Sequence, residues 1–120
     1  MQSIIESGTV DLLRLALDAS IMRQQAIAHN IANANTPGYQ RMGVSFEAQV
    51  AQLMDQQKAG TPTLPMAALR PEFVSIGQEP VSLDTEMASL AENTLHHQAL
   101  LKALSKQMSL VSTAINEGKR

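Results

Sequence analysis

Hydrophobic residues recur every three or four positions from Thr9 to Ala34, which is the spacing of one face of an α-helix. No Gly or Pro interrupts this stretch, and Ser7 or Thr9 can cap its first turn because a hydroxyl accepts a backbone N–H. The pattern predicts an amphipathic helix over residues 9–34. Its seam, written as a heptad, contains Val10, Leu13, Leu17, Ser20, Gln24, Ile27, Ile31 and Ala34.

A second helical pattern near the C-terminus predicts a longer helix over residues 84–117. Asp84 suits the N-cap position, Glu86 adds a negative charge to the first turn, and Gly118 suits the residue just after the helix. A heptad that starts at Met87 predicts the seam by which this helix packs against a neighbour. That seam contains Met87, Leu90, Thr94, His97, Leu101, Leu104, Met108, Val111 and Ile115.

Residues 35–83, between the two helices, have the composition of turns and loops. They open on the sequence Asn-Thr-Pro-Gly-Tyr, a strong helix stop, because proline cannot continue helical hydrogen bonding and glycine readily adopts a positive φ. Apolar residues at helical spacing then predict a short helix over residues 45–57. Four of the five prolines lie between residues 62 and 80, which predicts an irregular loop with one short strand or hairpin near 72–76.

These patterns predict an all-α fold with a single domain, residues 1–120, in which the two long terminal helices form an antiparallel, coiled-coil-like hairpin. Such a hairpin buries one narrow seam on each helix. Further apolar residues lie outside the two seams, namely Leu12, Leu15, Ile21, Leu95, Leu100 and Leu110. Since a two-helix hairpin cannot cover them, we expect additional helix partners from other chains.

Composition narrows the possible functions. The 120 residues carry a net charge of −2, whereas a protein that binds nucleic acid without sequence preference normally has a basic excess. The chain has no cysteine, which excludes disulfides, thiolate zinc sites and cysteine nucleophiles. No segment approaches the roughly 18 apolar residues of a transmembrane helix, and the N-terminus lacks the features of a cleaved secretory signal peptide.

The polar residues form no catalytic or metal-binding motif. His96 and His97 are neighbours that a helix points about 100° apart, and His29 has no carboxylate at ligand spacing. Asp84 and Glu86, like Asp11 and Asp18, are interpreted as helix-end or solvated-face charges rather than as a catalytic pair. The sequence has no nucleophile elbow, phosphate-binding loop or dinucleotide fingerprint. We therefore expect no enzymatic activity, no metal site and no cofactor.

The run that ends the first helix is more elaborate than a helix stop requires. A stop needs one Asn and one Gly, but this run uses Asn30, Asn33, Asn35, Thr36, Pro37, Gly38 and Tyr39. Asn is a poor residue inside a helix, although it caps helix ends and bonds to backbone groups. The excess indicates a turn whose shape matters. We expect Gly38 to take a positive φ, and Asn33 and Asn35 to hold the turn by hydrogen bonds.

This run resembles the N-terminal signature of the bacterial flagellar axial proteins, which are the rod, hook and hook-associated subunits. The resemblance extends to the two flanking heptad helices. The short chain, the lack of a large inserted middle domain and the stretch from Val81 to Leu100 resemble the smallest members, the proximal rod subunits. His97 departs from the family pattern, since relatives usually have Tyr at this position.

The resemblance implies a structural subunit that assembles helically into the drive shaft between the membrane ring and the hook. Its implied partners are itself, other rod subunits, the basal-body adaptor and membrane-ring proteins, and the flagellar type III export apparatus. In such a rod, which is periplasmic, the seam residues of both helices pack against each other and against neighbouring subunits. An alternative hypothesis is a small helical export chaperone or adaptor that binds one partner in the cytoplasm.

Overall fold

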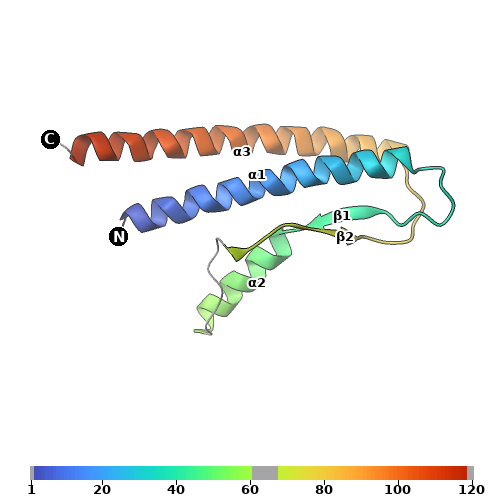
Figure 1. Ribbon diagram of the computed structural model, residues 1–120, viewed down its shortest axis with the longest axis horizontal. Coiled ribbons are helices and arrows are strands. Elements are labelled where there is room, and N and C mark those ends of the chain that lie inside the picture. The colour runs from blue at the N-terminus through green and yellow to red at the C-terminus, as the bar shows by residue number, and fades with distance from the viewer. Residues whose placement is uncertain (1, 61–67, 119–120) are drawn as a thin grey trace.

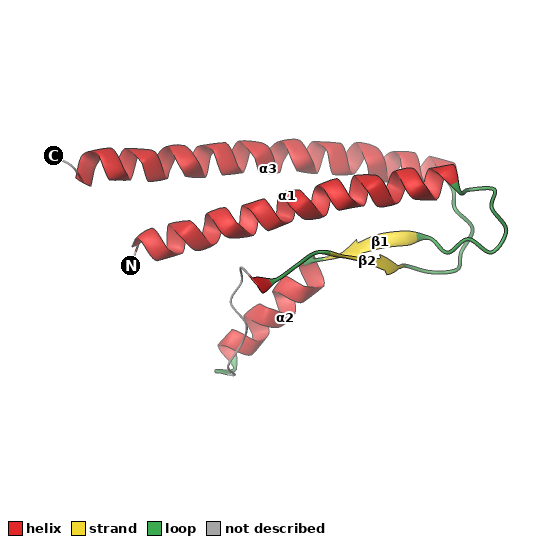
Figure 2. Cartoon of the chain, in the orientation of Figure 1, coloured by secondary structure: helices red, strands yellow, loops and turns green. Residues whose placement is uncertain are grey.

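The computed structural model describes residues 2–60 and 68–118, with side chains from residue 8 onward. Its elements in chain order are α1 (Gln2–Ala32), β1 (Met42–Ser45), α2 (Glu47–Lys58), β2 (Glu72–Ser75) and α3 (Leu83–Gly118). α1 and α3 lie side by side and antiparallel, so the start of α1 and the end of α3 are at the same end of the molecule (Figure 1). The two strands lie along the other half of α1, and α2 projects away from the long helices (Figure 2).

The pair of long helices confirms the predicted hairpin and the mainly helical fold. α3 spans nearly the predicted range, although Asp84 lies inside its first turn rather than at the N-cap. α1 begins at Gln2, seven residues before the predicted start, so the prediction that Ser7 or Thr9 caps this helix is wrong. The helix continues through Gly8 because glycine costs a helix only about 1 kcal/mol relative to alanine, which does not end a helix already formed on both sides.

The middle of the chain contains a small sheet in addition to the predicted short helix. β1 and β2 are antiparallel and pair Met42 with Ser75 and Ser45 with Glu72. β2 confirms the strand predicted near residues 72–76, whereas β1 is absent from the prediction because its short sequence, Met-Gly-Val-Ser, contains a glycine, which is uncommon in strands. Gly43 lets the two strands approach, since a Cβ at this position would lie 2.6 Å from Cγ2 of Ile76.

The apolar core lies between α1 and the middle of the chain. Leu15, Ala19 and Phe46 are buried together, with partly buried apolar residues packed around them: Leu12, Ala16, Val44, Val50 and Leu69. The expectation that Leu12 and Leu15 need partners from other chains is therefore wrong, because the chain's own Phe46 and its neighbours cover them. α1 has two covered faces, one toward α3 and one toward the segment from β1 to the start of α2.

Candidate functional site: the turn network and the faces of the long helices

Asn30 is the centre of a buried polar network at the end of α1. Its side chain is 1% exposed and pairs with both backbone groups of Met42. The Met42 N–H donates to Oδ1 of Asn30 at 2.8 Å, and Nδ2 donates to the Met42 carbonyl at 2.9 Å. In an antiparallel pair, the N–H and C=O of every second residue point away from the partner strand, and Met42 is such a residue. The carbonyl of its neighbour Arg41 points the other way and accepts a hydrogen bond from the Ile76 N–H. Asn30 therefore joins the end of α1 to the first residue of β1.

The hydroxyl of Tyr39 lies between Asn30 and His29. It donates to Oδ1 of Asn30 at 2.6 Å, and it accepts from Nδ1 of His29 at 2.8 Å because its single proton is already committed. The rings of His29 and Tyr39 have centroids 5.5 Å apart and are tilted by 42°. Burial, and to a smaller extent the carboxylate of Glu86, raises the pKa of Tyr39 above its ordinary value. The phenol therefore stays protonated and remains a donor to Asn30.

Asn33 closes the first part of the turn, as the sequence predicts. Its Nδ2 donates to the carbonyl of His29 at 2.9 Å, and its Oδ1 accepts from the hydroxyl of Thr36 at 3.2 Å. The backbone repeats this closure, because the Thr36 N–H donates to the Asn33 carbonyl at 3.0 Å and the Tyr39 N–H donates to the Thr36 carbonyl at 3.3 Å. These bonds direct the chain back so that Tyr39 meets the last turns of α1.

The rest of the predicted turn motif is exposed. Gly38 has a φ of +75°, which confirms the expected positive value. Pro37 and Asn35 both face solvent, and within residues 2–60 and 68–118 the Asn35 side chain makes no hydrogen bond. The expectation that Asn35 holds the turn is therefore wrong. The Asn30 side chain makes the contacts that stabilise the reversal, since it lies on the buried side of α1.

Glu86 ties the start of α3 to this network. Its side chain is 1% exposed, forms an ion pair with Nε of Arg41, and accepts from Nδ2 of Asn30 at 3.4 Å. Glu86 is a charge in the first turn of α3, as one of the two interpretations expected, but the alternative interpretation as a solvated-face charge is wrong because the side chain is buried. A buried carboxylate is costly unless it is paired, and here both of its oxygens have partners. These contacts form what we call the turn network, which joins α1, β1 and α3. Its members are His29, Asn30, Asn33, Thr36, Tyr39, Arg41, Met42 and Glu86.

A second polar contact lies in the middle of the helix pair. Ser20 is 0% exposed, and its hydroxyl donates to the Leu17 carbonyl at 2.8 Å. Nδ1 of His97 lies 2.6 Å from the same hydroxyl, and Nδ2 of Asn93 donates to the Ser20 carbonyl at 2.8 Å. Ser20 and His97 both belong to the predicted seams, so the structure brings these two seam positions together through a hydrogen bond.

The face of α3 that packs against α1 contains only every second residue of the predicted seam. Four of the nine predicted seam residues lie on this inner face and are half-buried: Leu90, His97, Leu104 and Val111. At four of the other five positions the preceding residue lies inward, namely Glu86, Asn93, Leu100 and Gln107, whereas Ala114, which precedes Ile115, is exposed. Four apolar residues of the predicted seam are exposed, by 62%, 48%, 48% and 54%: Met87, Leu101, Met108 and Ile115.

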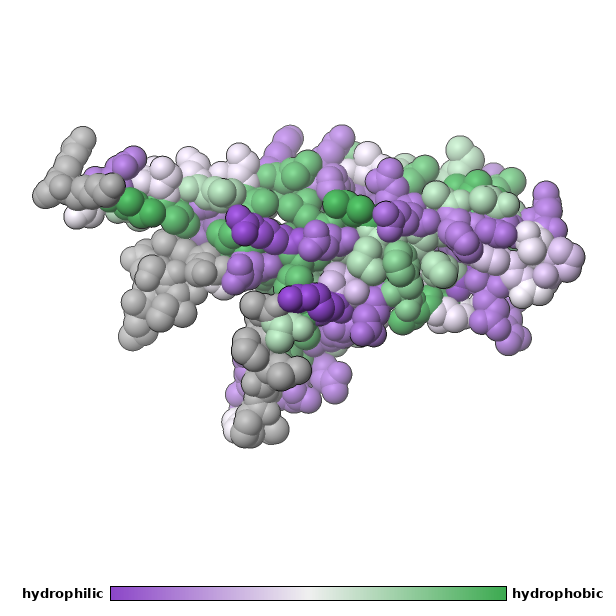
Figure 3. Space-filling view, viewed as in Figure 1, coloured by the Kyte–Doolittle hydropathy of each residue, from purple (hydrophilic) through white to green (hydrophobic). Residues whose placement is uncertain are grey.

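The four exposed seam residues form what we call the lateral stripe of α3, and they are spaced at multiples of seven residues. In α1, by contrast, the predicted seam is covered in the single chain: Leu17 and Ile27 are buried, and Leu13 and Ile31 are half-buried. Figure 3 shows hydrophobic residues in a broken band along the two long helices. Between Met87 and Asn116, α3 carries only three charged residues, Glu92, Lys102 and Lys106.

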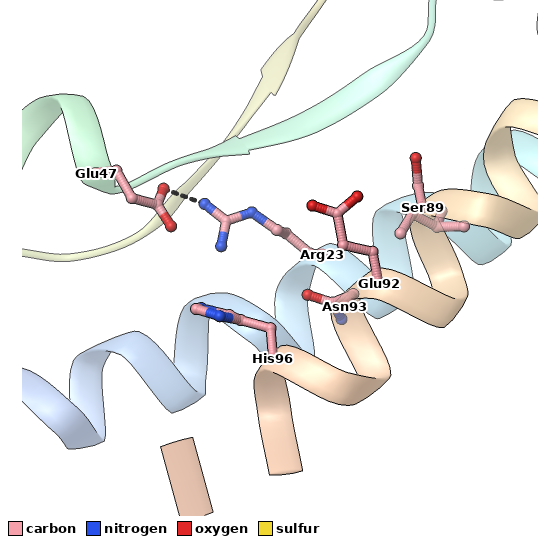
Figure 4. Close-up of a pocket in the computed structure, with 7 residues that line it drawn as sticks. Arg23, Glu47, Ser89, Glu92, Asn93 and His96 are labelled. Atoms are coloured by element: carbon pink, nitrogen blue, oxygen red, sulfur yellow. Dashed lines mark hydrogen bonds and ion pairs between the residues drawn. The ribbon is translucent and has the colours of Figure 1, made fainter. Parts of the chain in front are cut away.

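A groove with a volume of about 420 Å³ lies where α1, α3 and the start of α2 meet. Figure 4 shows Arg23 of α1 and Glu47 of α2 joined by an ion pair across it, and the α3 residues Ser89, Glu92, Asn93 and His96 around the same space. The described residues contain no group of three His, Asp or Glu side chains placed to hold a metal ion. Among the helices of the described chain, none has both the length and the apolar character to cross a membrane.

Known flagellar proteins match this sequence. A family model described as flagella basal body rod protein matches residues 14–40, which include most of α1 and the turn from Asn30 to Tyr39. The flagellar basal body rod protein FlgB of Escherichia coli K12 is 30% identical over 123 residues, covering 86% of this chain and 89% of that protein. FlgB of Bacillus subtilis is 29% identical over 129 residues, covering 94% and 97%. FlgB of Yersinia enterocolitica is 28% identical over 131 residues, covering 92% and 96%.

These similarities decide between the two functions that the sequence leaves open. They extend over nearly the whole chain and are shared with rod proteins from distant bacteria, so the hypothesis of a cytoplasmic chaperone is not supported. They also agree with the turn network and with the hairpin of long helices, which are the features that carry the family resemblance. The chain belongs to the FlgB family of flagellar basal body rod proteins, and it is a structural subunit of the rod rather than an enzyme.

Proposed function

We propose that this rod subunit assembles through the lateral stripe of α3, which packs against the long helices of neighbouring rod subunits. The observation that carries the proposal is the exposure of Met87, Leu101, Met108 and Ile115 on one side of a single helix. Intervals of seven residues keep apolar side chains in contact with a second helix along a shared seam. Each of these side chains gains on the order of 1 kcal/mol when its exposed half is buried, and the gain repeats with every subunit.

The turn network supports this proposal because it fixes the direction of the lateral stripe. Asn30 and Glu86 hold the first turn of α3 against α1 and β1. The stripe therefore has one orientation relative to the rest of the subunit before assembly. A polymer that transmits torque requires each subunit to present its contact face at a constant angle, and a buried ion pair with hydrogen bonds specifies such an angle better than an apolar contact alone.

The location of a rod in the basal body indicates which proteins contact this subunit. We propose that the stripe contacts copies of this chain and other rod subunits, and that the basal-body adaptor and membrane-ring proteins contact the subunits at the rod's base. The subunit reaches this periplasmic position through the flagellar type III export apparatus. The names of the relatives place those proteins in the basal body rod, which supports the shared location.

Leu101→Glu tests the lateral stripe. Leu101 is 48% exposed in the single chain, so the substitution leaves the isolated subunit helical but places a charge in the subunit contact. We expect the variant to be made and exported, and the amount that co-purifies with basal bodies to fall at least tenfold. Ala103→Glu introduces the same charge at an exposed position of α3, on the side away from Leu101, and is the matched control that should behave as wild type. Normal incorporation of Leu101→Glu would refute the proposed contact.

A further inference from the structure

The outer edge of α3, on the side opposite α1, has a basic and apolar character. We define it by Leu95, Lys102 and Lys106, which lie within one sector of the helix surface because they are separated by seven and four residues. Leu95 is 68% exposed, the highest value among the large apolar residues exposed in the described chain. Neither lysine forms an ion pair within the described residues. This edge lies roughly 100° around the helix from the lateral stripe, so the contact proposed above does not cover it.

The outer edge of α1 has the opposite character. Asp11, Asp18 and Ile21 lie on the side of α1 away from α3, separated by seven and three residues. Asp18 is exposed, Asp11 is half-buried, and Ile21 is exposed by 48%. Arg14 and Arg70 border the same surface. The edge is therefore acidic only at Asp11 and Asp18, and not along its whole length.

The residues of the two edges occur at matching heights along the hairpin. Ser20 bonds to Asn93 and lies beside His97, and Asn30 bonds to Glu86, which fixes the register of the antiparallel helices. In this register Ile21 is level with Leu95. Asp11 is level with the part of α3 between Lys102 and Lys106. A second hairpin placed beside the first, without a shift along the axis, therefore brings apolar residue against apolar residue and carboxylate against ammonium.

We infer that the outer α3 edge of one copy of this chain contacts the outer α1 edge of a second copy. This inference rests on the proposed rod function and names one contact within it. Ile21 packs on Leu95, and Asp11 lies between Lys102 and Lys106 of the neighbour. Because the two edges are different surfaces, the contact is head-to-tail, and such contacts propagate into rings or helices instead of stopping at a dimer.

Disulfide trapping tests the contact directly, because the natural chain has no cysteine. Cells carrying the full-length Ile21→Cys, Leu95→Cys double variant are oxidised, and their basal bodies are isolated. The two positions lie on opposite edges of one hairpin, too far apart for a bond within a chain, so any disulfide joins two copies. We expect dimers and higher multimers at a level at least tenfold above the Ala28→Cys, Leu95→Cys control. Ala28 is exposed and lies two turns, roughly 10 Å, farther along α1.

A charge exchange tests the proposed attraction between Asp11 of one copy and the lysines of the other. Lys106→Asp should lower the trapped fraction about threefold, as expected for a solvent-exposed ion pair, and Asp11→Lys in the same chain should restore it. Equal trapping in the Ile21 and Ala28 pairs would overturn the inference, and so would trapping of Leu95→Cys to a different protein. In both cases the variants would still be found in basal bodies. Absence of the unmodified chain from basal bodies would instead refute the rod function itself.

Discussion

The side-chain amide of Asn30 takes the place of a third strand beside Met42. It receives the Met42 N–H at 2.8 Å and donates to the Met42 carbonyl at 2.9 Å. A primary amide can do this because it offers a donor and an acceptor side by side. The same amide nitrogen also reaches Glu86 at the start of α3, so one side chain holds together the end of α1, the start of β1 and the start of α3.

Asn30→Asp should therefore destabilise the subunit strongly. The substitution removes the donor to the Met42 carbonyl and places a second carboxylate beside the buried Glu86. We expect the free energy of unfolding, measured by urea denaturation, to fall by about 3 kcal/mol. Asn35→Asp makes the same chemical change at an exposed position in the same turn and should cost within about 0.5 kcal/mol. Equal losses for the two variants would contradict the role given to Asn30.

Tyr39 makes the network sensitive to alkaline pH. Burial and then Glu86 raise the pKa of Tyr39, so the folded state binds this proton more tightly than the unfolded state does. The stabilisation is fully present below the ordinary tyrosine pKa of about 10 and is lost as the pH rises through the higher folded value. The chain has one tyrosine and no tryptophan, so the absorbance of tyrosinate reports this group alone.

The midpoint of that absorbance titration should lie above the ordinary value in the folded subunit and return to it in urea. The Tyr39→Phe variant is the control. Because it has no phenol at this position to ionise, its free energy of unfolding should not show the decrease at alkaline pH that Tyr39 causes in the natural chain. A midpoint that is the same in the folded and unfolded chains would show that the phenol is not desolvated beside Glu86, and would contradict its place in the network.

The long helices and the stop between them were predictable because their signals are local. Apolar residues at intervals of three and four specify a helix regardless of what covers it, and Pro37 followed by Gly38 ends one regardless of its surroundings. The seam of α3 was only half predictable. A reading that counts apolar residues selects Met87 and Leu101, whereas Glu86 and Asn93 point inward because α1 supplies hydrogen-bond partners for both side chains.

The network itself depends on pairs that no local pattern reveals. Asn30 and Glu86 are 56 residues apart, and each alone is typical of a helix end. One signal was present: Glu86, Asn93 and Leu100 are separated by seven residues each, which marks a continuous face of a helix. Polar residues on such a face, opposite Ser20 and Asn30 on the other helix, could have indicated a buried polar seam.

Phe46 and Phe73 provide a matched test of where the core lies. Phe46 is 4% exposed and packs against Leu15 and Ala19, whereas Phe73 is 45% exposed on β2. Phe46→Ala should lower the free energy of unfolding by about 3–4 kcal/mol, because it removes a large buried side chain and leaves a cavity. Phe73→Ala should cost less than about 1 kcal/mol. Similar urea midpoints for the two variants would place the core elsewhere, for example along the seam between α1 and α3.

Comparing the same substitution at Gly38 and at Gly60 separates the cost of backbone strain from the role of the turn in rod assembly. Both have a φ of +75°, and at both positions a Cβ would have no other atom within 4 Å. Valine at either position should therefore cost a similar amount, about 1–3 kcal/mol, since β-branched residues strongly disfavour a positive φ. Gly38, however, immediately precedes Tyr39, whose hydroxyl must reach Asn30, whereas Gly60 follows the projecting helix α2.

We expect Gly38→Val to abolish rod assembly and swimming motility, and Gly60→Val to retain most of both, although the two variants lose similar stability in urea. Gly38→Asn should recover part of the motility, because asparagine tolerates a positive φ better than other residues with a side chain. Motility of subunit-deletion cells that express each variant measures the difference. If Gly38→Val and Gly60→Val swim equally well, the turn would be a simple chain reversal, and its contacts with Asn30 would serve stability without directing assembly.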